Sequence, residues 1–277
     1  MNLSISNIAW KPEQDASVYA AMEKMGYTGL EIAPTRIFPE SPYTHLKEAR
    51  AFARQLKEHY GLSVCSMQSI WYGRTESLFG SREEREKLLD YTRQAIDFAE
   101  ALSCPNLVFG CPRNRRRPEG ADLGPVLEFF QKTAAYAAEC RATFSIEPNP
   151  PLYHTNFINT TEEACALTEK IRASLSAPSD REGIAVNLDL GTILENKESL
   201  EMLPAQLPLI RHIHISEPGL VCLTESHRDI YRSLTDLVRK AWKEHTWKGF
   251  LSIEMACLDS RERLFEVMGW ICEGRNS

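Results

Sequence analysis

The sequence lacks any apolar stretch near the roughly 18 residues that a membrane span requires. Its N-terminus also lacks the basic flank and the long apolar core of a secretory signal peptide. The chain has 8 cysteines, but none of them forms a C-x-x-C pair of the kind found in zinc knuckles and redox motifs. Scattered cysteines without such pairs are typical of reduced thiols in the cytosol. We therefore expect a cytoplasmic protein with no membrane partner.

The chain has no excess of basic residues, because 32 Lys and Arg face 38 Asp and Glu for a net charge of −6. A protein that binds duplex nucleic acid needs a basic face, so nucleic acid is not expected as the partner. No linker, low-complexity segment or charge block divides the sequence. Its 277 residues are close to the roughly 250 of a typical α/β barrel. We expect one domain over residues 1–277.

Strand-like and helical patterns alternate along the whole chain. Strands are predicted at residues 3–10, 29–32, 63–70, 106–109, 143–147, 184–189, 210–215 and 249–254. Helices are predicted at residues 12–25, 44–60, 82–102, 124–140, from 160 onward, and at 199–207, 229–245 and 260–272. Repeated strand–helix units of this kind fit a parallel barrel better than an open sheet. The predicted fold class is therefore α/β, a single (β/α)8 TIM barrel.

In the second half of the chain, each strand-like run ends on a residue that can bind a metal. These residues are Glu147, Asp189, His214 and Glu254. Active sites of barrel enzymes lie at the C-terminal ends of the strands, so the four side chains are expected to meet at one mouth. Three carboxylates and one imidazole suit a divalent cation with positions left open for substrate. The pattern predicts one divalent metal ion, with Mn²⁺ as the first expectation and Zn²⁺, Mg²⁺ or Co²⁺ as alternatives.

The motifs around these residues resemble the xylose isomerase-like superfamily of TIM barrels. This group includes sugar isomerases and epimerases, inosose dehydratases and AP endonuclease 2-type barrels such as endonuclease IV. The matching pieces are SIEPN at 145–149, NLD at 187–189, HIHISE at 212–217 and LSIEM at 251–255. The resemblance extends over essentially the whole chain.

The resemblance implies that Glu147, Asp189, His214 and Glu254 are the ligands of the metal. It further implies that Glu147 and Glu254 move protons in a sugar or sugar-phosphate isomerase or epimerase. One glutamate takes a proton from the carbon beside a carbonyl, and the other returns one. The chemistry is sound in itself, because a cation stabilises the charge that develops on the substrate oxygen. The expected partner is a small sugar or polyol.

The sequence also departs from the family pattern at several positions. Thr192 stands where ketose 3-epimerases have a histidine, and residues 217–220 lack their sugar-binding arginine. These differences speak against ketohexose 3-epimerase as the specific activity. Gln68 and Gly110 occupy the positions where endonuclease IV has histidines for its additional zinc ions. A three-metal DNA-repair nuclease is therefore not expected.

Further residues near the predicted strand ends are candidates for substrate binding. They are Asn149, His227, Arg113, Glu31, Gln68 and Trp10, with Arg115 as an alternative to Arg113. Each has a structural alternative: the arginines could form a solvated loop, Glu31 could accept backbone hydrogen bonds, and Trp10 could be a packing residue. Cys111 is interpreted as a loop-packing residue, and His212 is expected to point away from His214 and pack outside the barrel.

Two other functions remain open at this point. One is an inosose dehydratase-like lyase on the same metal site, which also begins with proton abstraction beside a carbonyl. The other is a sugar-binding or regulatory barrel without turnover, although a pure binder has no need for two opposed carboxylates. A homo-oligomer is possible.

Overall fold

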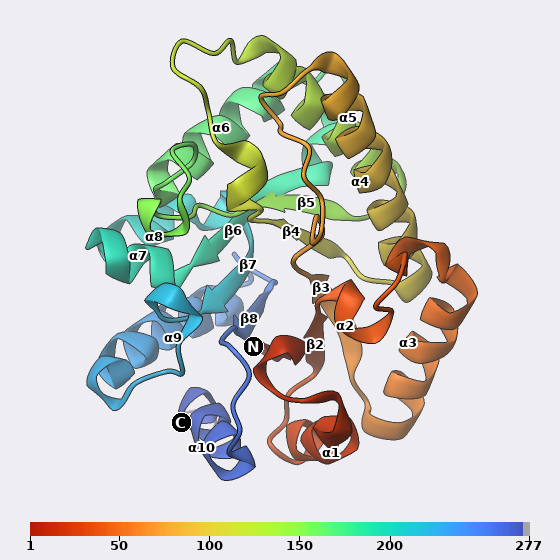
Figure 1. The fold of residues 1–277 in the computed structure, drawn as a ribbon. Helices are drawn as coiled ribbons and strands as arrows, with labels where there is room; N and C mark the ends of the chain where they lie inside the picture. The colour runs from red at the N-terminus through yellow and green to blue at the C-terminus, as the bar shows by residue number, and fades with distance from the viewer. Residues whose placement is uncertain (274–277) are drawn as a thin grey trace.

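The computed structural model describes residues 1–273. Its parallel strands close into a barrel in the order β1 to β8, and the helices surround it (Figure 1). The strands are β1 (Asn2–Ser6), β2 (Gly29–Ile32), β3 (Ser63–Met67), β4 (Asn106–Phe109), β5 (Thr143–Ile146), β6 (Ile184–Asp189), β7 (Ile210–Ile215) and β8 (Phe250–Ile253). The predicted (β/α)8 barrel is confirmed. The predicted one-domain span also includes residues 274–277, which lie outside the described part of the chain.

Helical segments follow every strand and form the outer ring seen in Figure 1. They are α1 (Asp15–Lys24), α2 (Pro34–Ile37), α3 (Leu46–Tyr60), α4 (Arg82–Leu102), α5 (Gly124–Glu139), α6 (Thr161–Ser174), α7 (Leu190–Asn196), α8 (Leu203–Gln206), α9 (Arg228–Lys243) and α10 (Arg261–Cys272). The helix predicted to begin at residue 160 is α6. Thr160 caps it by accepting a hydrogen bond from the Glu163 amide at 3.1 Å, which satisfies one of the free donors of the first turn.

The main differences from the predicted boundaries lie in β1, in β3 and in the sixth strand–helix unit. β1 ends at Ser6 instead of residue 10, because Asn7 begins a 3₁₀ turn and accepts a hydrogen bond from the Ala33 amide at 2.9 Å. β3 ends at Met67 instead of residue 70. In the sixth unit the prediction missed α7, which starts directly after β6, and the predicted helix over 199–207 is a series of short turns around α8.

The apolar core is a shell between the strands and the helices, and the inside of the barrel is polar. Leu3 and Ile5 on β1 belong to the apolar core, whereas Ser4 and Ser6 alternate with them and are buried polar residues. Hydrogen bonds cross between the strands inside the barrel, such as the one from Asn106 Nδ2 to Ser66 Oγ at 2.9 Å. Packing against the helices therefore holds the barrel together, while its interior is free to carry chemistry.

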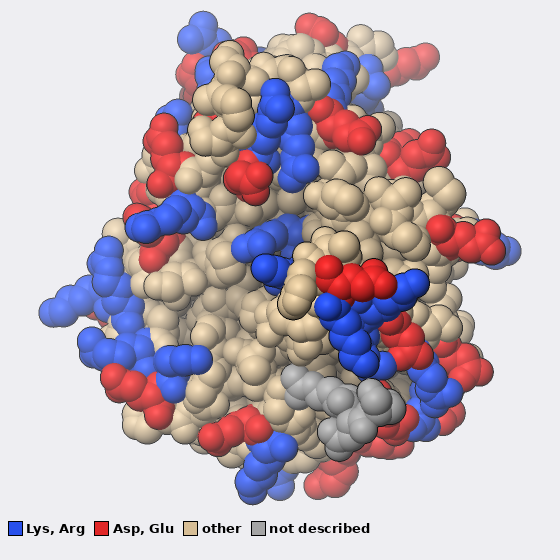
Figure 2. All heavy atoms as spheres, turned by 180° about the vertical axis from the view of Figure 1, so that it is seen from behind, with Lys and Arg blue, Asp and Glu red and all other residues tan. Residues whose placement is uncertain are grey.

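The surface is mixed in charge. Figure 2 shows acidic and basic side chains interspersed over one face, rather than gathered into a field of one sign. None of the helices in residues 1–273 has both the length and the apolar character that a membrane crossing requires.

Candidate metal centre

The four predicted ligands all lie at the carboxyl end of the barrel. Asp189 is the last residue of β6 and His214 lies near the end of β7, while Glu147 and Glu254 directly follow β5 and β8. Backbone hydrogen bonds continue the ladder through both glutamates, from Glu147 N to Phe109 O and from Glu254 N to Ile215 O, each at 3.0 Å. The closed sheet therefore fixes the backbone from which each side chain projects.

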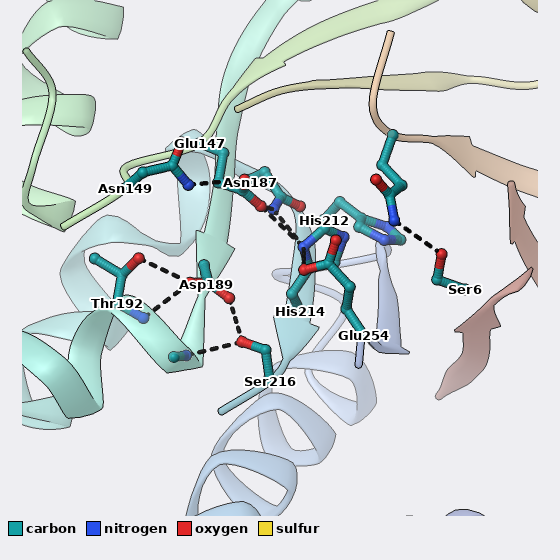
Figure 3. Close-up of polar contacts among 12 residues, drawn as sticks. Ser6, Glu147, Asn149, Asn187, Asp189, Thr192, His212, His214, Ser216 and Glu254 are labelled. Carbon is teal, nitrogen blue, oxygen red and sulfur yellow. Dashed lines mark hydrogen bonds and ion pairs between the residues drawn. The ribbon is translucent and has the colours of Figure 1, made fainter. Parts of the chain in front are cut away.

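The structure brings these four side chains together in one buried cluster (Figure 3). His214 Nδ1 lies 2.9 Å from Glu147 Oε1 and 3.1 Å from Glu254 Oε2. One possible ligand atom from each of the four residues, Asp189 included, lies within 4.8 Å of the others. Ligand atoms on opposite sides of an ion bound at about 2.1 Å are about 4.2 Å apart, so the spacing suits a single small cation.

Two side-chain amides hold Glu147 in place. Asn187 Nδ2 donates to Glu147 Oε1 at 2.7 Å, and Asn149 Nδ2 donates to Glu147 Oε2 at 3.1 Å. The carboxylate of Glu254 has no polar contact other than His214 among the residues the structure describes. The two glutamates both lie beside His214 but differ in their hydrogen bonding. Both carboxylate oxygens of Glu147 accept a hydrogen bond from an asparagine, whereas one carboxylate oxygen of Glu254 has no partner among residues 1–273.

Asp189 is held at both carboxylate oxygens. Thr192 donates to its Oδ2 through the backbone amide at 2.8 Å and through Oγ1 at 2.7 Å. Ser216 Oγ donates to Oδ1, and it accepts in turn from the Gly191 amide at 2.8 Å. Asp189 is therefore also the N-cap of α7, which explains why this helix begins directly at the end of β6.

The electrostatics of the cluster favour a cation. Burial raises the pKa of Glu254 to about 7, and burial together with the charge of Glu147 raises the pKa of Asp189. Burial alone would lower the pKa of His214, but Glu254 and Glu31 outweigh it and hold that pKa well above its usual value. Burial thus disfavours the charged forms of these two carboxylates, and a bound cation would offset that cost. The donor set of three carboxylates and one imidazole fits a divalent ion.

A cavity of about 150 Å³ opens beside the cluster. Glu147, Asp189 and Glu254 line it together with Gln68, Ser69, Val108, Gly110, Cys111, Pro112, Asn149, Tyr153 and Leu220. Pockets for drug-sized ligands usually exceed about 300 Å³, so this cavity suits a smaller molecule. A hydrogen bond from the Gly219 amide to Tyr153 Oη at 3.0 Å ties the loop after β7 to the loop after β5 at the edge of the cavity.

The predicted substrate-binding residues divide into two groups. Asn149 and Gln68 lie on the cavity wall. Trp10, Glu31, Arg113 and His227 are not part of that wall. Trp10 Nε1 donates to Asp15 Oδ1 at 2.7 Å, and Arg113 is exposed on the loop after β4. His227 Nδ1 lies 2.8 Å from Glu217 Oε1, within the loop after β7.

Arg115, the alternative to Arg113, is a buried structural brace. Its guanidinium donates to Glu147 O at 2.7 Å, to Asn149 Oδ1 at 2.8 Å and to Ile158 O at 3.3 Å. All three acceptors belong to the segment after β5, so a side chain from the loop after β4 fixes the backbone of a predicted ligand. The interpretation of Cys111 as a plain packing residue is incomplete, because Cys111 also lines the cavity.

The expectation for His212 is wrong. His212 lies inside the barrel, with its Nε2 3.0 Å from Glu31 Oε2, and does not pack outside against the helices. The physical reason is the two-residue period of a strand, which places His212 and His214 on the same face. The same period identifies Asn187, two residues before Asp189, and Ser216, two residues after His214, which the sequence interpretation missed.

A closed parallel barrel with three carboxylates and an imidazole at its strand ends defines the class: a (β/α)8 barrel with a candidate divalent-metal centre. A family model described as xylose isomerase-like TIM barrel matches residues 19–273, and the chain belongs to this family. The resemblance found in the sequence is thereby confirmed. A search of curated proteins finds no match.

Solved structures with the same fold include sugar epimerases. One is 3-keto-D-glucoside 4-epimerase from E. coli, at 16% identity and a TM-score of 0.71, with 100% of both chains covered. Another is D-psicose 3-epimerase from Clostridium cellulolyticum H10, at 14% identity and a TM-score of 0.72, covering 100% of this chain and 99% of that one. A third is the probable 3-DHS dehydratase from Bacillus anthracis, at 14% identity and a TM-score of 0.66, covering 99% and 100%. At these identities the likeness shows the fold.

Proposed function

We propose that the protein is a metal-dependent isomerase or epimerase of a small sugar or sugar-phosphate ketone. The observation that carries the proposal is the convergence of Glu147, Asp189, His214 and Glu254 beside a small cavity that both glutamates line. A divalent ion held by these four residues would polarise the substrate carbonyl and stabilise the negative charge that develops on its oxygen. The sugar epimerases among the solved structures with this fold support the same substrate class.

The two glutamates then act as the proton carriers. Glu254 is the better candidate for the first proton acceptor, because one of its oxygens has no hydrogen-bond partner in residues 1–273. Glu147 is bracketed by Asn187 and Asn149, so its carboxylate is oriented for a defined approach to the substrate. A proton taken by one glutamate and another returned by the second changes the configuration of one carbon or moves the carbonyl.

The remaining lining residues set the size and polarity of the substrate. Asn149 and Gln68 offer side-chain amides to hydroxyl groups, and the cavity of about 150 Å³ admits a molecule of monosaccharide size. Thr192 Oγ1 is engaged by Asp189 and Pro148 O, so it does not take the role of the histidine found in ketose 3-epimerases. This departure speaks against ketohexose 3-epimerase as the specific activity.

A second candidate is a lyase on the same site, which the dehydratase among the similar structures supports. It shares the first proton abstraction and differs in the loss of hydroxide from the neighbouring carbon. The product would then be one water lighter than the substrate, and mass spectrometry distinguishes the two reactions directly.

The test is solvent exchange in D₂O. The purified chain is incubated with Mn²⁺ and with ketoses, 3-keto-glycosides and inososes, and NMR follows the entry of deuterium at carbon. Zn²⁺, Mg²⁺ and Co²⁺ serve as alternative ions. We expect deuterium at one carbon beside the carbonyl, and a decrease of about 10²- to 10⁴-fold in Glu254→Gln, the size of a general-base contribution.

The matched control is Glu195→Gln, the same chemical change at an exposed position on α7. It should leave the rate unchanged. Intact exchange in Glu254→Gln would contradict the two-glutamate mechanism. Binding of a sugar without exchange of any carbon-bound hydrogen would favour the barrel without turnover.

A further inference from the structure

A buried acid lies on the far side of His214 from the predicted ligands. Glu31 on β2 is fully buried, and its Oε2 lies 3.0 Å from Nε2 of His214 and 3.0 Å from Nε2 of His212. β2 and β7 are not neighbours in the sheet, so these contacts cross the inside of the barrel. The wall of the cavity beside the cluster does not include Glu31, so its position does not support a direct contact with substrate.

The two nitrogens of His214 face different partners. Nδ1 faces Glu147 and Glu254, the side on which the predicted ligands converge, and Nε2 faces Glu31. A neutral imidazole has one N–H donor and one lone pair, and only the lone pair can bind a metal. A carboxylate that accepts the Nε2–H leaves the lone pair on Nδ1, where the other ligands meet.

The surroundings of Glu31 give little other explanation for a charged residue at this position. Its Oε1 has no hydrogen-bond partner, so the histidines are its only polar contacts among residues 1–273. A buried carboxylate is costly unless it is paired, and an apolar residue of similar size would commonly be at least as stable. The presence of an acid here points to a role toward the group it contacts rather than to the stability of the barrel.

We infer that Glu31 is a positioning residue for the metal centre. It accepts the Nε2–H of His214 and thereby presents Nδ1 to the ion, while His212, two residues earlier on β7, lies with its Nε2 3.0 Å from the same carboxylate oxygen. This inference rests on the proposed metal site and assigns Glu31 a role different from the substrate contact expected from the sequence.

The experiment is a calorimetric titration of the metal-free chain with Mn²⁺, which reports affinity and stoichiometry independently of activity. We expect one ion per chain in the wild type and a 10- to 100-fold weaker affinity in Glu31→Ala, the size of effect seen when such a supporting partner is removed. Glu31→Gln keeps an acceptor oxygen and should recover part of the affinity. His212→Asn should fall between the wild type and Glu31→Ala, and Glu195→Gln should match the wild type.

Thermal unfolding of each metal-free variant separates positioning from folding. A variant that melts as the wild type does and yet binds Mn²⁺ more weakly supports the inference. Unchanged affinity in a folded Glu31→Ala overturns it. A stoichiometry of two ions in the wild type, with one lost in Glu31→Ala, also overturns it, because Glu31 and His212 would then be ligands themselves. If the wild type binds none of the tested divalent ions, the proposed metal site fails and this inference with it.

Discussion

The two halves of the barrel differ in what their strand ends carry. At or directly after the C-terminal ends of β5 to β8 lie Glu147, Asp189, His214 and Glu254, whereas the corresponding positions of β3 and β4 are Gln68 and Gly110. The C-terminal half thus supplies the charged groups, and the N-terminal half supplies neutral or small groups that face them across the cavity.

Residues of the N-terminal half also hold predicted ligands of the C-terminal half in place. Glu31 on β2 contacts His214, and Arg115 after β4 donates to the backbone oxygen of Glu147. Both contacts join residues far apart in the sequence. The N-terminal half therefore orients the predicted ligands, and substitutions in it should weaken the site although no predicted ligand is replaced.

The largest expected effect is that of Arg115→Met. The substitution removes the donors to Glu147 O, Asn149 Oδ1 and Ile158 O. Ile158 O keeps the hydrogen bond from the Asn149 amide at 3.0 Å, but Glu147 O and Asn149 Oδ1 lose their donor, each at a cost of about 1–3 kcal/mol. We expect the free energy of unfolding to fall by about 3 kcal/mol in urea denaturation. Arg113→Met, the same change two residues away at an exposed position, should alter it by less than about 0.5 kcal/mol. Equal effects of the two substitutions would remove the distinction between a brace and a solvated loop.

A smaller effect is expected from Gly110→Ala at the end of β4. A Cβ there would lie 2.6 Å from Glu147 Oε2 and 3.4 Å from Asn149 Oδ1, so the carboxylate has to move. If Glu147 moves a proton as proposed, a displacement of its carboxylate costs up to about 10²-fold in rate, and we expect kcat to fall by about 10-fold or more. Gly269→Ala on α10, where a Cβ meets nothing within 4 Å, is the control and should not change kcat. Wild-type kcat in Gly110→Ala would mean that the N-terminal half does not constrain Glu147.

The smallest effect concerns the reactivity of Cys111 on the cavity wall. Burial raises the pKa of its thiol to about 12, and only the thiolate reacts with iodoacetamide. At pH 8 we therefore expect slow labelling of Cys111 and fast labelling of the exposed Cys257. Raising the pH toward 10 should speed up labelling of Cys111, since the thiolate fraction grows as the pH approaches the pKa. Peptide mass spectrometry measures both rates, and rapid labelling of Cys111 at pH 8 would place it in an open, solvated wall.

Much of the fold could be predicted because its signals are local. The alternation of periodicities defines the strand–helix units, and a polar residue after each late strand identifies Glu147, Asp189, His214 and Glu254. The boundary of β1 could not be read in this way, because Ile8, Ala9 and Trp10 are apolar in a turn as they would be in a strand. The start of α7 was missed because Asp189 was interpreted only as a ligand, although an aspartate before a helix is also a common cap.

The support of the site could not be predicted because it depends on contacts across the barrel. Nothing in the local sequence indicates that Glu31 meets His214, or that Arg115 turns inward while Arg113 stays exposed. His212 is a different case, since the two-residue period of a strand was sufficient to place it beside His214. Local sequence patterns thus predict the charged residues at the strand ends. The residues that hold them in place, such as Glu31 and Arg115, are recognised only in the closed barrel.

The double engagement of Asp189 has a consequence for how occupancy of the site can be observed. The same carboxylate faces the ligand cluster and holds the amide of Thr192 at the start of α7. Binding of a ligand to the Asp189 carboxylate is therefore linked to the opening of the first turn of α7. The linkage is reciprocal, so opening of this turn changes the affinity for the ligand by the same factor. The rate of amide hydrogen exchange at Thr192 should therefore report whether the centre is occupied, and it can be measured without substrate and without turnover.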